Sequence, residues 1–171
     1  WGSLIQREQD GKDLVIRRRM FQAEVYAASR ILTMLRFPAQ PVAGAVRSIE
    51  RIEKETGISY AERQKEAIRQ ALDKGLLILT GGPGTRKTTT LNAIIRLPKA
   101  NGEKVLLGAP TGRAAKRMSE LTGEEAKTIH RLLQVEWDEN DHQMFAKNEK
   151  NLTDCDALIL DGLSMVDVLL F

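Results

Sequence analysis

The segment at residues 76–90, LLILTGGPGTRKTTT, constrains the fold of this 171-residue chain more than any other stretch. Four apolar residues precede a turn that contains three glycines, and Lys87 and Thr88 follow the turn. An apolar strand, a glycine-rich loop and a helix start in this order are typical of a phosphate-binding P-loop. Glycine lets backbone N–H groups turn toward an anion, and the helix start adds its positive dipole end. The sequence therefore predicts a nucleotide site, against the alternative of an ordinary glycine-rich turn.

Each residue type in this loop has an expected role. Lys87 is expected to meet the β- and γ-phosphates as a point charge, and the Thr88 hydroxyl to ligate Mg²⁺. The other expected nucleotide contacts are Gly81, Gly82, Pro83, Gly84, Thr85 and Thr89. Arg86 departs from the pattern GxxxxGK[ST], in which a glycine precedes the lysine because backbone lies close to phosphate there.

The composition describes an ordinary globular protein rather than a disordered one, with 42% hydrophobic and 29% charged residues. The net charge of +3 permits a nucleic-acid partner without requiring one. The single cysteine, Cys155, excludes an internal disulfide framework, and no His/Cys cluster predicts a metal site. No apolar run approaches the ~20 residues of a membrane span. We therefore expect a cytoplasmic protein without a membrane partner.

The first 75 residues are expected to be mainly helical. Apolar positions three and four apart, followed by turn residues, predict helices over residues 20–35, about 45–55, and from residue 59 or 60 to about 74. Residues 1–19 are polar and mixed. The run Arg17-Arg18-Arg19 within them is either a solvated surface or a contact for phosphate groups.

Two more apolar runs follow the glycine-rich loop and predict buried strands at residues 104–110 and 157–160. Between these strands and the loop, helices are expected over residues 87–97, from about residue 112, and over 123–133, with a small hairpin around 135–137 and 144–145. The first of these helices is expected to end at Pro98. Continuous apolar strands that alternate with helices predict an α/β fold with a parallel sheet covered by helices.

Ligands of such sheets bind at the carboxyl ends of the strands. Three segments follow predicted strands directly: residues 81–88, residues 110–113, and Asp161. We therefore expect these segments to lie along one edge of the sheet.

Three blocks of this sequence closely resemble consecutive motifs of RecD-like DNA helicases, superfamily 1 enzymes that move 5′ to 3′ on single-stranded DNA. The blocks are GGPGTRKTTT, GAPTGRAAKRMSELTGEEAKTIHRLL and DALILDGLSMVD. The likeness extends to FQAE at residues 21–24, to Gln64 and to residues 145–148, and covers most of residues 20–169. It implies a RecA-like P-loop NTPase sheet, here incomplete, preceded by an N-terminal helical segment.

The resemblance also implies a domain organisation. Residues 1–55 would form a helical linker region, and residues 56–171 the first RecA-like motor domain, truncated after the Walker B strand. A strand that inserts between the two Walker strands would lie beyond Phe171, as would the second RecA-like domain with its arginine finger. The implied partners are single-stranded DNA, that remainder of the helicase and, if the parent works within one, a larger nuclease–helicase complex.

Individual roles follow from the same resemblance. Gln64 would read the adenine edge, and Asp161 would hold the Mg²⁺ of bound ATP through water, so that Lys87 and Asp161 are the catalytic residues and Thr88 and Asp161 the metal residues. Two motifs would contact the DNA strand: Pro110, Thr111, Gly112 and Arg113 in the first, and Thr128, His130 and Arg131 in the second.

The residues alone leave plainer alternatives open. Gln64 is otherwise an exposed helix glutamine, Asp161 a strand-end cap, and His130 a structural histidine. Arg113, together with Lys116 and Arg117, is otherwise a solvated helix face.

Two departures from the family pattern fall on catalysis, at Arg86 and at Gly162. Gly162 stands where the family has the glutamate that orients or deprotonates the attacking water. Glycine can do neither, so we expect a helicase fragment that binds Mg²⁺-ATP and DNA but hydrolyses ATP poorly. The alternatives are a degenerate nucleotide- or DNA-binding module without ATPase activity, and a P-loop NTPase that is not a helicase, such as a kinase or transport ATPase. Deliberate substitution or misassignment of the two residues is a further alternative.

Overall fold

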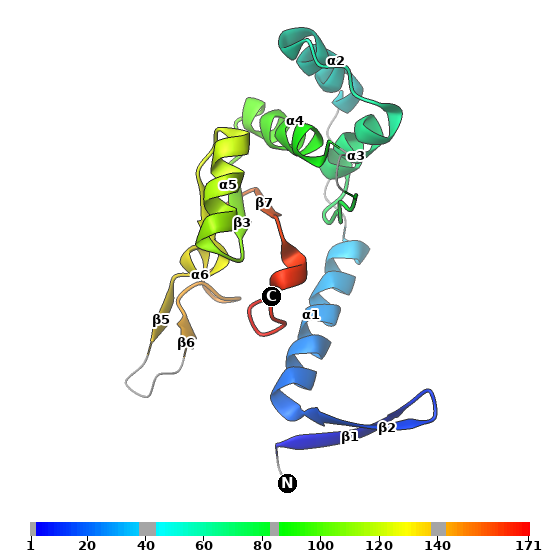
Figure 1. The fold of residues 1–171 in the computed structure, drawn as a ribbon, viewed down its shortest axis with the longest axis vertical. Coiled ribbons are helices and arrows are strands. Elements are labelled where there is room, and N and C mark those ends of the chain that lie inside the picture. The colour runs from blue at the N-terminus through cyan, green and yellow to red at the C-terminus, as the bar shows by residue number, and fades with distance from the viewer. Residues whose placement is uncertain (1–2, 38–43, 83–85, 138–142) are drawn as a thin grey trace.

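A computed structural model describes residues 3–37, 44–82, 86–137 and 143–171 of the chain (Figure 1). The first described element is a β-hairpin of β1 (Leu4–Gln9) and β2 (Lys12–Arg17), paired antiparallel from Leu4↔Arg17 to Gln9↔Lys12. Asp10 and Gly11 form its turn, with φ values of +53° and +71°. Two positive φ values in a two-residue loop match the twist of the strands, and Asp-Gly is a preferred sequence for such a turn. No element was predicted for these residues, although the Asp-Gly pair is a recognisable turn signal.

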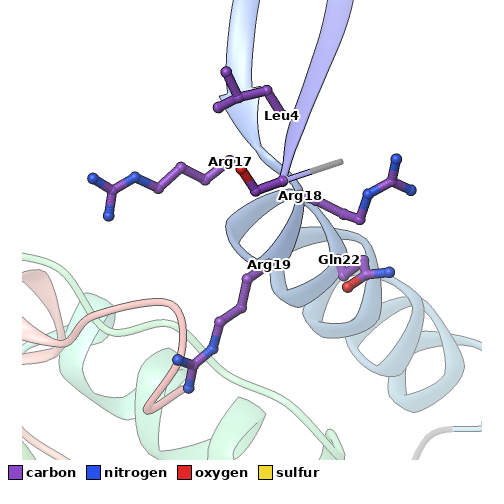
Figure 2. Close-up of a pocket in the computed structure, with 6 residues that line it drawn as sticks. Leu4, Arg17, Arg18, Arg19 and Gln22 are labelled. Atoms are coloured by element: carbon purple, nitrogen blue, oxygen red, sulfur yellow. The ribbon is translucent and has the colours of Figure 1, made fainter. Parts of the chain in front are cut away.

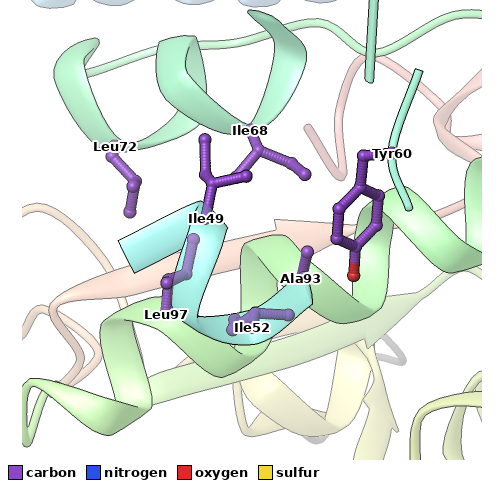
Figure 3. Packing of buried hydrophobic residues seen from close by; sticks show 7 residues of the cluster. All are labelled: Ile49, Ile52, Tyr60, Ile68, Leu72, Ala93 and Leu97. Atoms are coloured by element: carbon purple, nitrogen blue, oxygen red, sulfur yellow. The ribbon is translucent and has the colours of Figure 1, made fainter. Parts of the chain in front are cut away.

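The hairpin passes directly into α1 (Arg18–Arg36), which confirms the amphipathic helix expected at 20–35 and extends it at both ends. Next, α2 (Ala45–Thr56), α3 (Glu62–Asp73) and α4 (Lys87–Ala100) pack on one another. Their shared core, shown in Figure 3, consists of Ile49, Ile52, Tyr60, Ile68, Leu72, Ala93 and Leu97. Burial of each large aliphatic side chain contributes about 1.5–3 kcal/mol, so this core joins α2 to the helix that begins with Lys87.

The central sheet has three parallel strands in the order β4-β3-β7: β4 (Ala126–Thr128), β3 (Val105–Ala109) and β7 (Ala157–Leu160). Helix α5 (Gly112–Thr122) packs on β3 and β4. A second core joins α4, β3 and α5 through Ile95, Leu107 and Met118. The expected parallel sheet flanked by helices is therefore confirmed, with strand bounds within one residue of those predicted for β3 and β7.

The strand expected at residues 76–79 is absent from the strands of the described part of the chain. Ile78 is 75% exposed and Leu79 is 37% exposed. An extended apolar segment becomes a strand only when a neighbour satisfies its backbone N–H and C=O groups, and no such neighbour pairs with it among the described residues. Apolar pattern alone was thus insufficient to predict a strand here.

Two further expectations were wrong at element boundaries. Helix α4 continues through Pro98 to Ala100, so the proline lies in its last turn rather than after its end. The helix expected at 123–133 is instead β4 followed by the short α6 (Ile129–Leu132). Pairing of β4 with β3 outweighs the helix preference of its Ala-Lys sequence.

The small hairpin expected around residues 135–137 and 144–145 is confirmed, whereas the turn after β7 was not predicted. Strands β5 (Val135–Trp137) and β6 (Gln143–Phe145) form the small antiparallel hairpin, and the 3₁₀ turn η1 (Leu163–Met165) follows β7. None of the helices in the described ranges combines the length and apolar character that crossing a membrane requires.

Candidate nucleotide and nucleic-acid sites

The carboxyl edge of the sheet gathers residues from three separate stretches of sequence. Ala109 in β3 pairs with Thr128 in β4, and Gly108 pairs with Leu160 in β7. Because all three strands are parallel, Thr128 at the end of β4, Pro110 after β3 and Asp161 after β7 lie along the same edge. The expected meeting of residues 110–113 with Asp161 is therefore observed, and Thr128 lies beside them, but the strand expected before residue 81 is not part of this sheet. Residue 87 begins α4 rather than following a strand of this sheet.

Asp161 is fixed at this edge by two backbone interactions. Its N–H donates to the Gly108 carbonyl oxygen at 3.0 Å, which extends the pairing of β7 with β3 by one residue. Its Oδ1 accepts a hydrogen bond from the Gly162 N–H at 2.9 Å. The carboxylate therefore has the local role expected of a strand-end aspartate, and its side chain remains exposed to solvent at the strand end.

Gly162 adopts the left-handed conformation, with φ of +70°. A Cβ built at this position would lie 3.3 Å from Met165 Cε and 3.4 Å from two ring carbons of Pro110. A glutamate in this backbone would be strained by its φ and crowded by its neighbours. The local structure is therefore one that glycine adopts readily and a glutamate does not.

Arg86 is the other departure from the family pattern, and here a residue with a side chain replaces a glycine. It is the N-cap of α4 and has φ of +54° and ψ of +35°, so a residue with a Cβ occupies the left-handed region. That conformation costs a non-glycine residue about 1–2 kcal/mol, whereas glycine adopts it freely. The backbone thus gives a direct reason for a glycine immediately before the lysine of a P-loop.

The side chains beyond Arg86 are arranged as a helix start. Lys87 is exposed, Thr88 and Thr89 are half-buried, and the first turn of α4 contains no acidic residue. Gly81 and Gly82, the first two glycines of the loop, are exposed. Three expected contacts, Pro83, Gly84 and Thr85, lie outside the described residues.

Gln64 is half-buried and holds α3 against the start of α4. Its Oε1 accepts a hydrogen bond from the Ala61 N–H at 2.9 Å, and its Nε2 donates to Thr90 Oγ1 at 3.0 Å. Thr90 is only 3% exposed, and its hydroxyl lies 3.4 Å from the Arg86 carbonyl oxygen. The glutamine therefore contacts the helix that begins with Lys87. The alternative prediction, an exposed helix glutamine, did not include this contact.

Sequence reasoning also missed Thr90 itself. The signal was available, since Thr90 lies one helical turn after Arg86 and three residues after Lys87, on the first turn of a helix. A threonine there can bond the carbonyl four residues earlier and still present an oxygen to a neighbouring helix.

Each of the two motifs expected to contact DNA contains a threonine that caps the start of a helix. Thr111 is the N-cap of α5, and its Oγ1 accepts a hydrogen bond from the Ala114 N–H at 3.2 Å. Thr128 is the N-cap of α6, and its Oγ1 accepts from the Arg131 N–H at 3.2 Å. Threonine is a favoured N-cap residue, so both hydroxyls have a structural role that sequence reasoning did not weigh.

Around these caps the side chains differ in exposure. Thr111, Gly112 and Arg113 are exposed at the start of α5, whose first turn carries no acidic residue. Arg131 is exposed, while His130 is half-buried. The start of the 11-residue α5 thus combines a positive helix end with an accessible guanidinium group, which suits contact with phosphate oxygens.

Two of the expected site residues, Thr88 and Asp161, offer oxygen donors of the type that Mg²⁺ prefers, although no contact between described residues joins the two. Mg²⁺ prefers oxygen ligands and is usually held by one or two protein groups together with substrate phosphates and water. Thr88 offers a hydroxyl in the first turn of α4, and Asp161 an exposed carboxylate at the strand end. The described ranges contain no cluster of three or more His, Cys, Asp or Glu side chains suited to a metal.

Similarity to known proteins defines the class to which this arrangement belongs. Residues 64–171, more than half of the chain, match the family described as an AAA domain. The chain therefore belongs to that family.

Curated relatives narrow the class further. The chain is 36% identical over 156 residues to the ATP-dependent RecD2 DNA helicase of Deinococcus radiodurans, covering 91% of this chain and 21% of that protein. It is 32% identical over 179 residues to the RecBCD enzyme subunit RecD of Mycolicibacterium smegmatis, covering 91% and 31%. It is 40% identical over 98 residues to the ATP-dependent DNA helicase dda of Enterobacteria phage T4, covering 54% and 22%. These matches confirm the resemblance to RecD-like superfamily 1 helicases, and the chain spans about a fifth to a third of these relatives' length.

Proposed function

We propose that this chain binds Mg²⁺-ATP and single-stranded DNA as a linker and first motor domain of an ATP-dependent 5′–3′ DNA helicase. The observation that carries the proposal is the carboxyl edge of the sheet, where Asp161, Pro110 and Thr128 follow neighbouring parallel strands. Under this proposal, one nucleotide motif and both DNA motifs would share an edge. The relatives named as ATP-dependent DNA helicases support the same reading.

On the nucleotide side, Lys87 would place a positive charge against the phosphates at the start of α4. Thr88 and Asp161 would hold Mg²⁺, which when bound neutralises charge that develops on the phosphates. Gln64 would meet the adenine edge. Its bond to Thr90 then connects adenine recognition to the helix that carries Lys87.

On the DNA side, the exposed start of α5 would contact phosphates through the Gly112 backbone, the Thr111 hydroxyl and the Arg113 guanidinium group. Pro110 would set the path of the backbone into this motif. Thr128, His130 and Arg131 would form the second contact. The strand of DNA would then lie along the same edge that carries Asp161.

We propose that hydrolysis is impaired. Gly162 supplies no carboxylate to orient a water molecule, and its φ of +70° with a crowded Cβ position disfavours a glutamate in this backbone. The same observation favours a second candidate function, a nucleotide- and DNA-binding module without ATPase activity. DNA-stimulated release of phosphate that a Lys87→Ala variant lacks would exclude that second candidate.

The proposal extends to organisation and partners. Residues 1–55 would act as a helical linker region and residues 56–171 as the truncated motor domain. The second RecA-like domain would complete the ATPase site, and a larger nuclease–helicase complex is the natural setting for a relative of a RecBCD subunit. A cytoplasmic location is part of the same proposal.

Equilibrium binding of a fluorescent ATP analogue with Mg²⁺ tests the nucleotide half. We expect saturable binding by the unaltered chain and a loss of at least about tenfold in affinity for Lys87→Ala, because a charge-assisted phosphate contact is removed. Lys54→Ala is the matched control, since Lys54 is exposed on α2 and its loss changes the net charge equally. Lys54→Ala should bind as the unaltered chain does.

Absence of saturable binding by the unaltered chain would contradict the nucleotide half of the proposal. Equal losses in Lys87→Ala and Lys54→Ala would contradict the assignment of Lys87. Binding of labelled oligothymidylate, with preference over duplex DNA of equal length, tests the DNA half and separates a helicase from other P-loop NTPases.

A further inference from the structure

Three consecutive arginines at the junction of the hairpin and α1 lie outside every motif described above. Arg17 ends β2, and Arg18 and Arg19 begin α1. A cavity of about 580 Å³ opens at this junction and is lined by Ser3, Leu4, Arg17, Arg18, Arg19 and Gln22 (Figure 2). The side chains of all three arginines and of Gln22 are exposed.

The backbone beneath this arginine junction is held in place by several contacts. No loop separates β2 from α1, and the Arg18 N–H donates to the Ser3 carbonyl oxygen at 2.8 Å. The guanidinium carbon of Arg7 lies 4.8 Å from the centre of the Phe21 ring, so the hairpin also packs against α1 through a cation–π contact. The three basic side chains therefore project from a fixed platform rather than from a free tail.

The acidic side chains of the hairpin lie away from this platform, and on α1 the first acidic residue, Glu24, comes five residues after Arg19. Asp10 lies in the turn of the hairpin and Glu8 and Asp13 lie close to it. At ~3.3 Å per residue, Asp13 is about 13 Å along β2 from Arg17. The first turn of α1 contains no acidic residue. Within the described ranges no ion pair joins a carboxylate to Arg17 or Arg19. Positive charge is therefore concentrated at the end of the hairpin that meets α1.

The directions of the side chains indicate the kind of anion that suits them. In Figure 2 the guanidinium groups of Arg17, Arg18 and Arg19 point away from one another rather than toward a common centre. A single small anion is held by converging donors, whereas a polyanion with successive charges several ångströms apart can meet donors that diverge. The fan of guanidinium groups therefore fits a nucleic-acid backbone better than an isolated phosphate.

The position of the junction in the molecule is compatible with that ligand. In Figure 1 β7 points toward the half of the molecule that contains β1 and β2, so the carboxyl edge of the sheet faces the same half. Tyr26 on α1 donates a hydrogen bond to Glu149 Oε2 at 3.1 Å, which joins α1 to the segment after β6. Single-stranded DNA that extends beyond the sheet edge would thus enter the half of the molecule that contains the three arginines.

We propose that Arg17 and Arg19, assisted by Arg18 and Gln22, form a second phosphate-contacting surface for single-stranded nucleic acid. This surface is separate from the motifs at residues 110–113 and 128–131. The inference rests on the proposed DNA binding and extends it to the N-terminal hairpin. Its contacts are with phosphates, so it adds affinity without sequence preference.

The test uses the 171-residue chain and a fluorescein-labelled oligothymidylate of about 20 nucleotides, with anisotropy titrations between about 50 and 200 mM salt. The Arg17→Gln/Arg19→Gln variant leaves Arg18 and the backbone contact to Ser3 in place. We expect its affinity to fall about three- to tenfold at low salt. The slope of log K against log salt should also become shallower by about 1.4, since each lost phosphate contact removes about 0.7.

Two further variants separate this inference from the proposed function. Arg36→Gln/Arg47→Gln removes the same charge from exposed positions on α1 and α2 and should leave affinity and salt slope unchanged. Arg113→Gln probes the start of α5. If Arg113→Gln weakens binding while Arg17→Gln/Arg19→Gln does not, the inference that Arg17 and Arg19 contact phosphates is wrong. The proposed function would then still hold.

Other results would overturn the inference in different ways. Equal losses in the Arg17/Arg19 and Arg36/Arg47 variants would mean that net charge, and not this surface, sets affinity. An unaltered chain that binds no oligothymidylate would contradict both proposals. Binding to vesicles of phosphatidylcholine with phosphatidylserine that depends on Arg17 and Arg19, without effect of these residues on oligothymidylate, would assign the surface to anionic lipid instead.

Discussion

The carboxyl edge of the sheet and the segment before α4 carry the two halves of the proposed nucleotide site, yet they are supported very differently. At the edge, Asp161 continues a ladder of paired parallel strands, and Thr111 and Thr128 each cap the helix that follows. Before α4, residues 76–79 pair with no described strand, Ile78 is 75% exposed, and Arg86 has a strained φ. The edge is supported by strand pairing within the described chain, whereas residues 76–79 and Arg86 have no such pairing among the described residues.

Shortening an apolar side chain to alanine should change the free energy of unfolding very differently in the two regions. This is the largest effect that we expect. Leu107 in β3 is 2% exposed, and Leu107→Ala should lower the free energy of unfolding by about 2–5 kcal/mol through lost burial and a cavity. Ile78→Ala should change it by less than about 0.5 kcal/mol, as an exposed position does. Urea denaturation followed by circular dichroism measures both. Comparable losses would mean that residues 76–79 pack in solution as a strand does, and the contrast between the regions would disappear.

The second prediction concerns the glycine at the sheet edge. Gly162→Ala should lower the free energy of unfolding by about 1–2 kcal/mol, because alanine is strained at φ of +70° and its Cβ would meet Met165 and Pro110. Gly112→Ala is the matched control, since its Cβ would meet nothing within 4 Å and its φ is not positive. That variant should be neutral or slightly stabilising. Indistinguishable stabilities would show that the edge tolerates a side chain at residue 162.

The third prediction concerns the strained backbone of Arg86, immediately before α4. Arg86→Gly should raise the free energy of unfolding by about 0.5–1 kcal/mol, since relief of the left-handed strain exceeds the extra entropy of glycine in the unfolded chain. Arg96→Gly, at an exposed interior position of the same helix, should instead lower it by about 1 kcal/mol. Thermal unfolding of both variants beside the unaltered chain measures the sign. A destabilising Arg86→Gly would mean that the arginine side chain makes contacts that outweigh its strain.

The same contrast explains which strands could be predicted from the sequence and which could not. Apolar runs at residues 104–110 and 157–160 predicted β3 and β7 because those strands find partners in the chain, and their common edge followed from parallel pairing. The equally apolar run at 76–79 failed because pattern cannot report whether a partner is present. β4 was missed because Ala126 and Lys127 favour helices in isolation, and only pairing with β3 makes them a strand.

Side-chain geometry was less accessible than the strands. The glycine pattern of the P-loop predicted that Arg86 would be out of place, and its left-handed φ supplies the physical reason. The bond from Gln64 to Thr90 was not predictable, since it requires the packing of α3 on α4. The Asp-Gly turn of the N-terminal hairpin was predictable from its two residues and was overlooked.

The smallest expected effect tests how α2 is joined to the helices that position Lys87. Glu53 Oε1 accepts a hydrogen bond from the Tyr60 N–H at 2.8 Å, and Oε2 lies 3.2 Å from Lys65 Nζ. The backbone hydrogen bond first, and the lysine second, hold the pKa of Glu53 below its ordinary value of 4.5. A carboxyl group whose pKa is lower in the folded state stabilises the fold above pH 4.5, and this contribution is lost as the pH falls through the folded pKa.

Glu53→Gln should therefore reduce the acid sensitivity of the free energy of unfolding below about pH 4.5, because the variant has no carboxylate to protonate at this site. Glu50→Gln removes the same charge from an exposed position on α2 and should retain the acid sensitivity of the unaltered chain. Urea denaturation at a series of pH values compares the three proteins. If Glu53→Gln and Glu50→Gln respond to acid alike, the contact between Glu53 and the start of α3 does not hold α2 in place. The apolar core around Ile49 and Ile68 would then be sufficient to join α2 to α3 and α4.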